Sequence, residues 1–190
     1  EGLAGGNAIR CVGKYLYEKG IVPRRDMRIE TARGVNEVKV YSFSGKVNSA
    51  SVNLGKAELA GAKIPSVWNE ERIVGKPVTI GGKDYKITLV NIGNPHCVVF
   101  SEKVDAVPLE TVGPEFENCE YFPERINVEF IRVVNKVTIK MRVWERGNGE
   151  TWSCGTGAAA AVVAAVLGGY CEQDTNVTVK LRGGDLVVNY

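Results

Sequence analysis

The sequence predicts an α+β fold with two central helices, each associated with a strand-rich half. Apolar residues recur every three or four positions after residue 7, which indicates an amphipathic helix. A second helix is expected over 158–167, which is apolar nearly all round, as in a helix enclosed by protein. Alternating apolar and polar residues elsewhere indicate strands. The two helix starts, at 5–8 and 154–158, form a weak internal repeat.

The first helix is expected to begin after Gly5-Gly6-Asn7 and to end near Gly20, a left-handed cap ahead of Pro23. The basic cluster at 24–28 is interpreted as a solvated loop. Strand signals follow: an alternating strand over 137–143, hairpins that turn at 81–82 and 183–184, and extended segments at 35–43 and 94–100. The segment 63–76 is interpreted as a short helix or a linker.

Composition excludes several classes of function. The 190 residues include 44% hydrophobic and 24% charged residues and carry a net charge of +2, which gives no electrostatic reason to expect nucleic acid or a membrane surface as a partner. No apolar run approaches the roughly 20 residues of a membrane-spanning helix. The five cysteines are odd in number and show no Cys-x-x-Cys spacing, which argues against a disulfide framework or a zinc site and favours a reducing cytoplasm.

Cys154 stands where a helix start gives it two functions. The first-turn N–H groups lack partners and carry roughly half a positive charge, so Gly155, Thr156 and Gly157 suit a bound carboxylate. The same surroundings are expected to lower the Cys154 pKa below about 8.5 and to make it the first thiol labelled by iodoacetamide. The helix alone is equally compatible with a buried cysteine that caps the core.

Three further positions suggest an amino-acid site. Glu145 and Arg146 end the alternating strand ahead of a glycine-rich turn that leads to Cys154. They can bind an ammonium and a carboxylate, or form a surface ion pair. His96, the only histidine, follows a Gly-Asn-Pro turn and is either a structural residue or a site residue. Asn127 is either a hydrogen-bonded core residue or a ligand contact.

Four segments together resemble diaminopimelate epimerases in order and spacing, over essentially the whole chain. They are Gly6-Asn7-Ala8-Ile9-Arg10-Cys11, Gly93-Asn94-Pro95-His96, Arg125-Ile126-Asn127, and the long, specific motif Glu145-Arg146-Gly-x-Gly-Glu150-Thr151-x-x-Cys154-Gly155-Thr156-Gly157-Ala158. The resemblance implies interconversion of LL- and meso-diaminopimelate, in lysine and cell-wall precursor biosynthesis. Two cysteines would act on opposite faces of the α-carbon, one removing and one delivering a proton, without pyridoxal phosphate or metal.

The resemblance also implies two pseudo-symmetric domains, each a strand-rich, barrel-like sheet around a central helix, with the active site between them. Residues 1–47 would be the remainder of a first domain truncated at its N-terminus, because the family carries roughly 65 residues before this point. Residues 48–180 would be the second domain, and 181–190 a final strand returning to the first. A cytoplasmic homodimer that binds neither nucleic acid nor membrane is expected.

Carried over residue by residue, Cys154 is one acid–base group, and His96 and Glu145 support the acid–base cysteines. The substrate-binding positions implied are Gly6, Asn7, Asn94, Asn127, Glu145, Arg146, Gly155 and Thr156. Gly5 stands where the family has its second catalytic cysteine. Cys11 does not replace it, because it matches a separate family cysteine one and a half turns into the helix.

Three hypotheses follow from Gly5. The chain is a diaminopimelate epimerase sequence altered at this position, or a catalytically impaired form of the same fold that binds an amino acid. The third is an isomerase of the related phenazine-biosynthesis-like group, which shares the architecture but lacks the paired cysteines. The intact motif over 145–154 argues against the third hypothesis.

Overall fold

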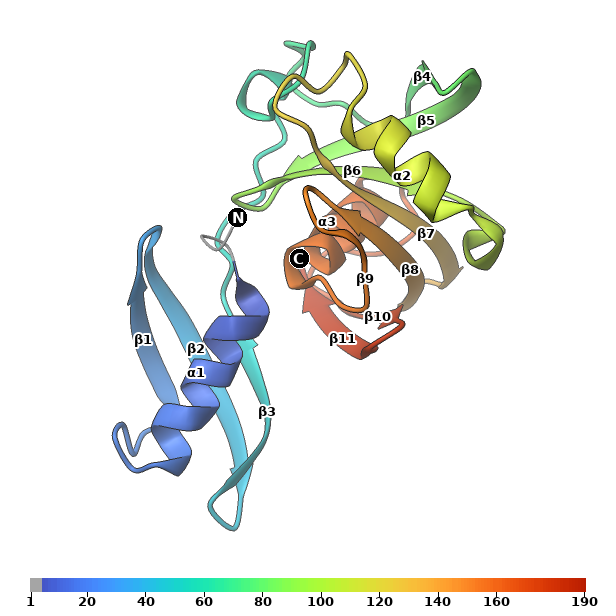
Figure 1. The fold of residues 1–190 in the computed structure, drawn as a ribbon. Helices are drawn as coiled ribbons and strands as arrows, with labels where there is room; N and C mark the ends of the chain where they lie inside the picture. The colour runs from blue at the N-terminus through green and yellow to red at the C-terminus, as the bar shows by residue number, and fades with distance from the viewer. Residues whose placement is uncertain (1–4) are drawn as a thin grey trace. The chain divides into compact units, whose positions relative to one another are not determined.

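The computed structural model describes residues 5–190 and confirms the α+β class. The chain divides into two compact units, one ending at Lys56 and the other spanning Ala57–Tyr190. Each unit combines helix and sheet (Figure 1). Residues 1–4, which belong to the expected first domain, lie outside the described residues.

The first unit is one helix on a three-stranded sheet. Helix α1 (Gly6–Glu18) is followed by β1 (Asp26–Thr31), β2 (Gly34–Phe43) and β3 (Lys46–Val52), which pair antiparallel in the order β1-β2-β3. The helix lies against β2 and β3. Met27, Val38, Val40 and Val47 form the buried centre, and Ile9 and Leu16 of α1 pack against them. The predicted helix and the extended segment 35–43 are therefore confirmed.

The second unit is built on a larger mixed sheet. Its strands are β4 (Lys76–Ile80), β5 (Lys83–Asn91), β6 (Pro95–Phe100), β7 (Asn127–Asn135), β8 (Thr138–Glu145), β9 (Gly149–Thr151), β10 (Asn176–Leu181) and β11 (Gly184–Asn189). The order is β11-β10-β8-β7-β6-β5-β4, and β9 pairs with β8. The β6–β7 and β8–β10 pairs are parallel, and the other pairs are antiparallel. Both predicted hairpins, β4–β5 and β10–β11, are present.

Helix α3 (Gly155–Leu167) is enclosed by this sheet. It contacts β5, β6, β7, β8, β10 and β11, and every residue from Thr156 to Ala165 is buried (Figure 1). Its alanines present little bulk, so the surrounding strands can approach the helix axis closely. The prediction of a helix inside the protein is confirmed. The position of the helix start, with Cys154, is consequently fixed by the packing of the helix that follows it.

Helix α2 (Leu109–Glu117) covers the opposite face of the sheet. Leu109, Val112 and Phe116 pack in one cluster with Cys97 and Val99 of β6. Since side chains alternate along a strand, the intervening residues of β6 point to the α3 face. Strand β6 is therefore covered on both sides, which explains why Pro95–Val99 are all buried.

The structure differs from the sequence prediction in several places. The expected boundary after residue 47 falls inside β3, which pairs with β2 as far as Val52, so the division comes after Lys56. The final strand, expected to return to the first domain, pairs with β10 in the second unit. Part of the expected loop at 24–28 belongs to β1. The segment 63–76 is irregular apart from the end of a short 3-10 helix at Gly61–Lys63; a second lies at Val104–Ala106.

Among the described residues, the longest helices have only 13 residues, and none is long and apolar enough to cross a membrane.

Replacing Val179 by alanine tests the enclosure of α3. Val179 of β10 is fully buried, so Val179→Ala is expected to lower the free energy of unfolding by about 2–3 kcal/mol, from lost transfer energy and the cavity left behind. Val187 of the paired strand β11 is 64% exposed, and Val187→Ala is expected to change it by less than about 0.5 kcal/mol. Urea denaturation measures both. Equal losses would contradict the packing of β10 against the core.

Candidate active site

Cys154 is the N-cap of α3. Its backbone is extended, with φ −133° and ψ 109°, and its Sγ accepts a hydrogen bond from the N–H of Gly157 at 3.3 Å. The Thr156 hydroxyl lies 3.6 Å from the same sulfur. The side chain is 7% exposed. The thiol therefore occupies the position that a serine or aspartate cap usually takes.

The pKa of Cys154 moves in the direction opposite to the sequence expectation. Burial, followed by the nearby carboxylates of Glu129 and Glu145, raises the pKa of this thiol to about 12. The hydrogen bonds from Thr156 and Gly157 act in the other direction but are outweighed. The expected lowering was wrong because the thiol is buried and two carboxylates act on it.

His96 and Glu129 form a fully buried pair beside this helix start. The Nδ1 atom of His96 lies 2.7 Å from Oε1 of Glu129, and its Nε2 lies 3.0 Å from Oδ1 of Asn94. His96 and Glu129 come from neighbouring parallel strands, since His96 is in register with Asn127 and Val98 with Glu129. Burial raises the pKa of Glu129, while His96 opposes that rise.

Gly157 allows Glu129 and Cys154 to approach one another. A Cβ atom at Gly157 would lie 2.7 Å from Oε1 of Glu129 and 3.1 Å from Sγ of Cys154. No larger residue fits between the carboxyl group and the thiol without displacing one of them. The side chains around Gly157 thus require glycine at this position, in addition to any requirement from a ligand.

The Asn127 side chain joins two strand ends. Its Nδ2 donates to the carbonyl of Pro95 at 2.8 Å, and its Oδ1 accepts from the backbone N–H of Arg146 at 2.8 Å. The residue is 1% exposed. The structure therefore shows Asn127 as a hydrogen-bonded core residue, and its contact with a ligand stays a prediction. This amide therefore holds the start of β6, next to His96, and the end of β8 in fixed positions relative to each other.

Glu145 and Arg146 lie at the end of β8, as expected. The Glu145 carboxylate accepts a hydrogen bond from the hydroxyl of Thr151 in β9. The guanidinium of Arg146 donates to the carbonyl of Glu124 at 3.1 Å. The chain then reverses through Gly147 and Gly149, whose φ angles of 78° and 82° favour glycine.

The buried carboxylate of Glu117, in α2, holds this turn. It accepts hydrogen bonds from the N–H of Gly147 at 2.8 Å, from Nε1 of Trp144 at 2.7 Å, and from Nη1 of Arg125 at 3.0 Å. Trp144 in turn packs closely on α2, because a Cβ atom at Gly113 would lie 2.4 Å from its ring. This role was not predicted from the sequence, because no helix was expected over 109–117 and a single glutamate there carries no motif.

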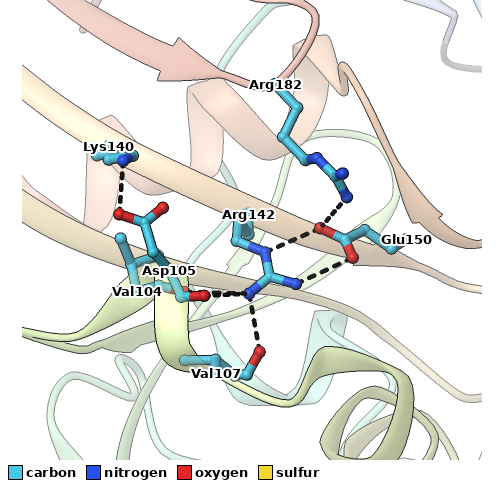
Figure 2. Close-up of polar contacts among 7 residues, drawn as sticks. All are labelled: Val104, Asp105, Val107, Lys140, Arg142, Glu150 and Arg182. Carbon is cyan, nitrogen blue, oxygen red and sulfur yellow. Dashed lines mark hydrogen bonds and ion pairs between the residues drawn. The ribbon is translucent and has the colours of Figure 1, made fainter.

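A second network anchors β9, the segment that leads to Cys154 (Figure 2). Arg142 donates from Nε and Nη2 to the two carboxylate oxygens of Glu150, at 2.9 and 3.0 Å, and Arg182 adds an ion pair at 3.1 Å. The Nη1 atom of Arg142 donates to backbone carbonyls, of which that of Val107 is closest at 2.8 Å. Glu150, part of the long motif, therefore serves to fix β9.

The first helix start has a simpler environment. Gly5 is the N-cap of α1 and makes no side-chain cap, and among residues 5–190 a Cβ atom there would meet only Cβ of Ala8, at 3.5 Å. Gly6 is buried beside Leu54. The Asn7 amide accepts a hydrogen bond from Arg10 at 2.6 Å. These residues belong to the first unit, whereas Cys154, His96, Asn127 and Glu145 belong to the second.

Comparison with known proteins decides the family. The family model for diaminopimelate epimerase matches residues 88–190. A diaminopimelate epimerase from Pelotomaculum thermopropionicum is 50% identical over 185 residues, covering 97% of this chain and 65% of that protein. One from a Geobacillus species is 44% identical over 191 residues, covering the whole chain and 67% of that protein. The chain belongs to the diaminopimelate epimerase family.

The fold of this family member is shared more widely. The crystal structure of a hydroxyproline epimerase from Agrobacterium vitis superposes with a TM-score of 0.69, covering 95% of this chain and 57% of that one, at 14% identity. At this identity the likeness shows the fold alone. The sequence relatives, by contrast, favour the diaminopimelate epimerase family over the phenazine-biosynthesis-like group. The chain spans about two thirds of the length of those relatives.

Within residues 5–190, no group of three or more His, Cys, Asp and Glu side chains is arranged to hold a metal ion.

The order of thiol labelling tests the environment of Cys154. Because this thiol is buried and its pKa is raised to about 12, iodoacetamide at neutral pH is expected to label the exposed Cys11 well before Cys154. Peptide mass spectrometry during a time course measures the order. Faster labelling of Cys154 would show that the helix start outweighs the carboxylates.

Replacing Glu117 tests the support of the turn at 147–149. Glu117→Gln keeps the shape but brings an amide N–H group toward donors, so the free energy of unfolding is expected to fall by about 1–3 kcal/mol. Glu120→Gln is the matched control, because Glu120 is exposed and lies three residues further on. Urea denaturation of both variants checks this. A Glu117 variant as stable as the Glu120 variant would contradict the proposed role.

Proposed function

We propose that this chain acts as an amino-acid epimerase on the α-carbon of diaminopimelate, with Cys154 as an acid–base group on one face. The observation that carries the proposal is the cysteine at the N-cap of α3, with its sulfur beside the first-turn N–H groups. Such a helix start binds a carboxylate and holds a proton carrier next to the adjacent carbon. Membership of the family supports the choice of substrate.

The reaction follows from this placement. The substrate carboxylate binds at the N–H groups of Gly155 and Thr156, which brings its α-carbon to the sulfur. The Cys154 thiolate removes the α-proton: the C–H bond breaks, an S–H bond forms, and the electron pair spreads onto the carboxylate. The first-turn N–H groups stabilise that developing charge. In the reverse direction the thiol returns the proton.

The remaining positions carried over from the family are proposed to select the substrate. Arg146 and Glu145 suit the carboxylate and ammonium of an amino-acid head. Asn94 and Asn127 suit hydrogen bonds to it, and Gly6 and Asn7 suit a second approach to the α-carboxylate. His96 and Glu145 are proposed to support proton transfer. We further propose a cytoplasmic homodimer in lysine and cell-wall precursor biosynthesis that needs neither pyridoxal phosphate nor metal.

Gly5 favours a second candidate, an impaired form that binds diaminopimelate but inverts it poorly. The family has a catalytic cysteine here, and glycine offers no proton carrier for the other face of the α-carbon. Among the described residues, a Cβ atom at Gly5 would contact only Ala8, at 3.5 Å, so these residues leave room for the missing side chain. The φ angle of −71° is also open to any residue. Restoring cysteine is therefore structurally feasible.

Proton exchange in deuterium oxide separates these functions. The chain with Gly5 is expected to exchange the α-proton of LL-diaminopimelate slowly without substantial inversion, and Gly5→Cys is expected to gain inversion to the meso form. Cys154→Ser is expected to lower exchange at least about 100-fold, because the acid–base group is lost. Mass spectrometry reports deuterium, and chiral chromatography reports the stereoisomers.

Cys11→Ser is the matched control, because it removes an exposed thiol from the first helix and is expected to leave exchange unchanged. Inversion by the Gly5 chain as fast as by Gly5→Cys would contradict the role of position 5. Exchange that survives Cys154→Ser would contradict the role of Cys154.

A further inference from the structure

Glu129 is a buried carboxylate that the proposed reaction does not yet use. It is fully buried, and one of its oxygens, Oε1, is paired with His96. Its other oxygen, Oε2, is the one buried side-chain N or O atom of the described residues that has no hydrogen-bond partner. Leaving such an atom unpaired is costly, so a group that can donate a proton to it is expected nearby.

The Cys154 thiol is a candidate donor on the same side of Gly157. Oε1 of Glu129 and Sγ of Cys154 lie 2.7 and 3.1 Å from the same point, where a Cβ atom of Gly157 would stand. The two groups make no hydrogen bond in the described conformation, so sharing a proton between them requires the Cys154 side chain to rotate toward Oε2 while His96 keeps its contact with Oε1. Gly157 keeps the space between them open.

The charges around the pair are compatible with a shared proton. The titratable groups that act on Glu129 and Cys154 are His96 and Cys97 of β6 and Glu145 of β8. A thiol whose pKa is raised to about 12 yields almost no thiolate to neutral solvent. Burial also raises the pKa of Glu129, so its carboxylate holds a proton more strongly than an exposed carboxylate does.

We propose that Glu129 is a positioning residue for Cys154. The Glu129 carboxylate accepts the thiol proton on Oε2 and returns it when the sulfur must act as an acid. In the forward step the S–H bond breaks, an O–H bond forms on Glu129, and the negative charge moves to sulfur. The Gly157 N–H and the Thr156 hydroxyl then donate to the thiolate. His96 holds Oε1 in place, and rotation of the Asn94 amide accommodates either form of the ring.

The contribution of this transfer to turnover rests on the proposed epimerase function, but the transfer itself can be tested without substrate. Iodoacetamide labelling of Cys154 in the full chain is measured by peptide mass spectrometry between about pH 6 and 9, with Cys11 in the same sample as the reference. Labelling must be proportional to reagent concentration. An internal proton acceptor makes the thiolate fraction independent of pH. The labelling rate of Cys154 is therefore expected to be slow and to change little with pH.

Glu129→Gln removes the acceptor while its amide oxygen can still pair with His96. Its labelling rate is expected to rise about tenfold per pH unit, because only solvent can then remove the proton. Glu129→Asp restores a carboxylate and is expected to recover part of the flat profile. Glu102→Gln is the matched comparison, since it neutralises an exposed carboxylate of the same unit and is expected to stay flat.

A steep profile in the unaltered chain, or a flat one in Glu129→Gln, would overturn the proposal. Should Glu129→Gln unfold, the comparison of Glu129→Asp with Glu102→Gln decides: a steep profile in the aspartate variant also overturns the proposal. These outcomes are independent of the epimerase proposal. A flat profile without diaminopimelate exchange contradicts only the function, and exchange with a steep profile contradicts only the role of Glu129.

Discussion

The enclosure of α3 by its sheet is the constraint on which the rest of the second unit depends. Ten consecutive residues of this helix are buried, and eight of them are alanine or valine. A helix of this kind gains its stability from packing in all directions, so it cannot slide or tilt without exposing apolar surface. Its first turn, together with Cys154, is therefore held at a buried position. This burial explains both the protection of the thiol and the cost of ionising it.

Fixing the helix would be of little use if the strand ends around it could move. Glu117 holds the turn after β8, Asn127 joins the starts and ends of β6, β7 and β8, and the Arg142–Glu150 pair anchors β9. Each is a polar group with its partners satisfied in a poorly solvated region, where an unmade bond costs more than a made bond gains. The network thus specifies one arrangement of the loops that lead into the site.

The sequence predicted the parts of this fold that repeat. The amphipathic period of α1, the apolar run of α3 and the two hairpins are all present. It missed α2, because Gly113 and Pro114 interrupt a nine-residue helix and weaken any periodic signal. It also gave no role to Glu129, because a carboxylate between Val128 and Phe130 reads as the solvent-facing position of an alternating strand. That carboxylate is buried because both faces of the sheet are covered, and this covering is a tertiary property that the local sequence pattern does not show.

The error in the expected pKa of Cys154 has the same origin. A helix start lowers a thiol pKa when solvent supplies the rest of its surroundings, whereas here burial and two carboxylates supply them. The reversal suits the proposed chemistry in one respect. An α-proton is a weak acid, and a thiolate of higher pKa is a stronger base toward it. The limiting quantity is then how often that thiolate forms, and this is the step that we propose Glu129 to assist.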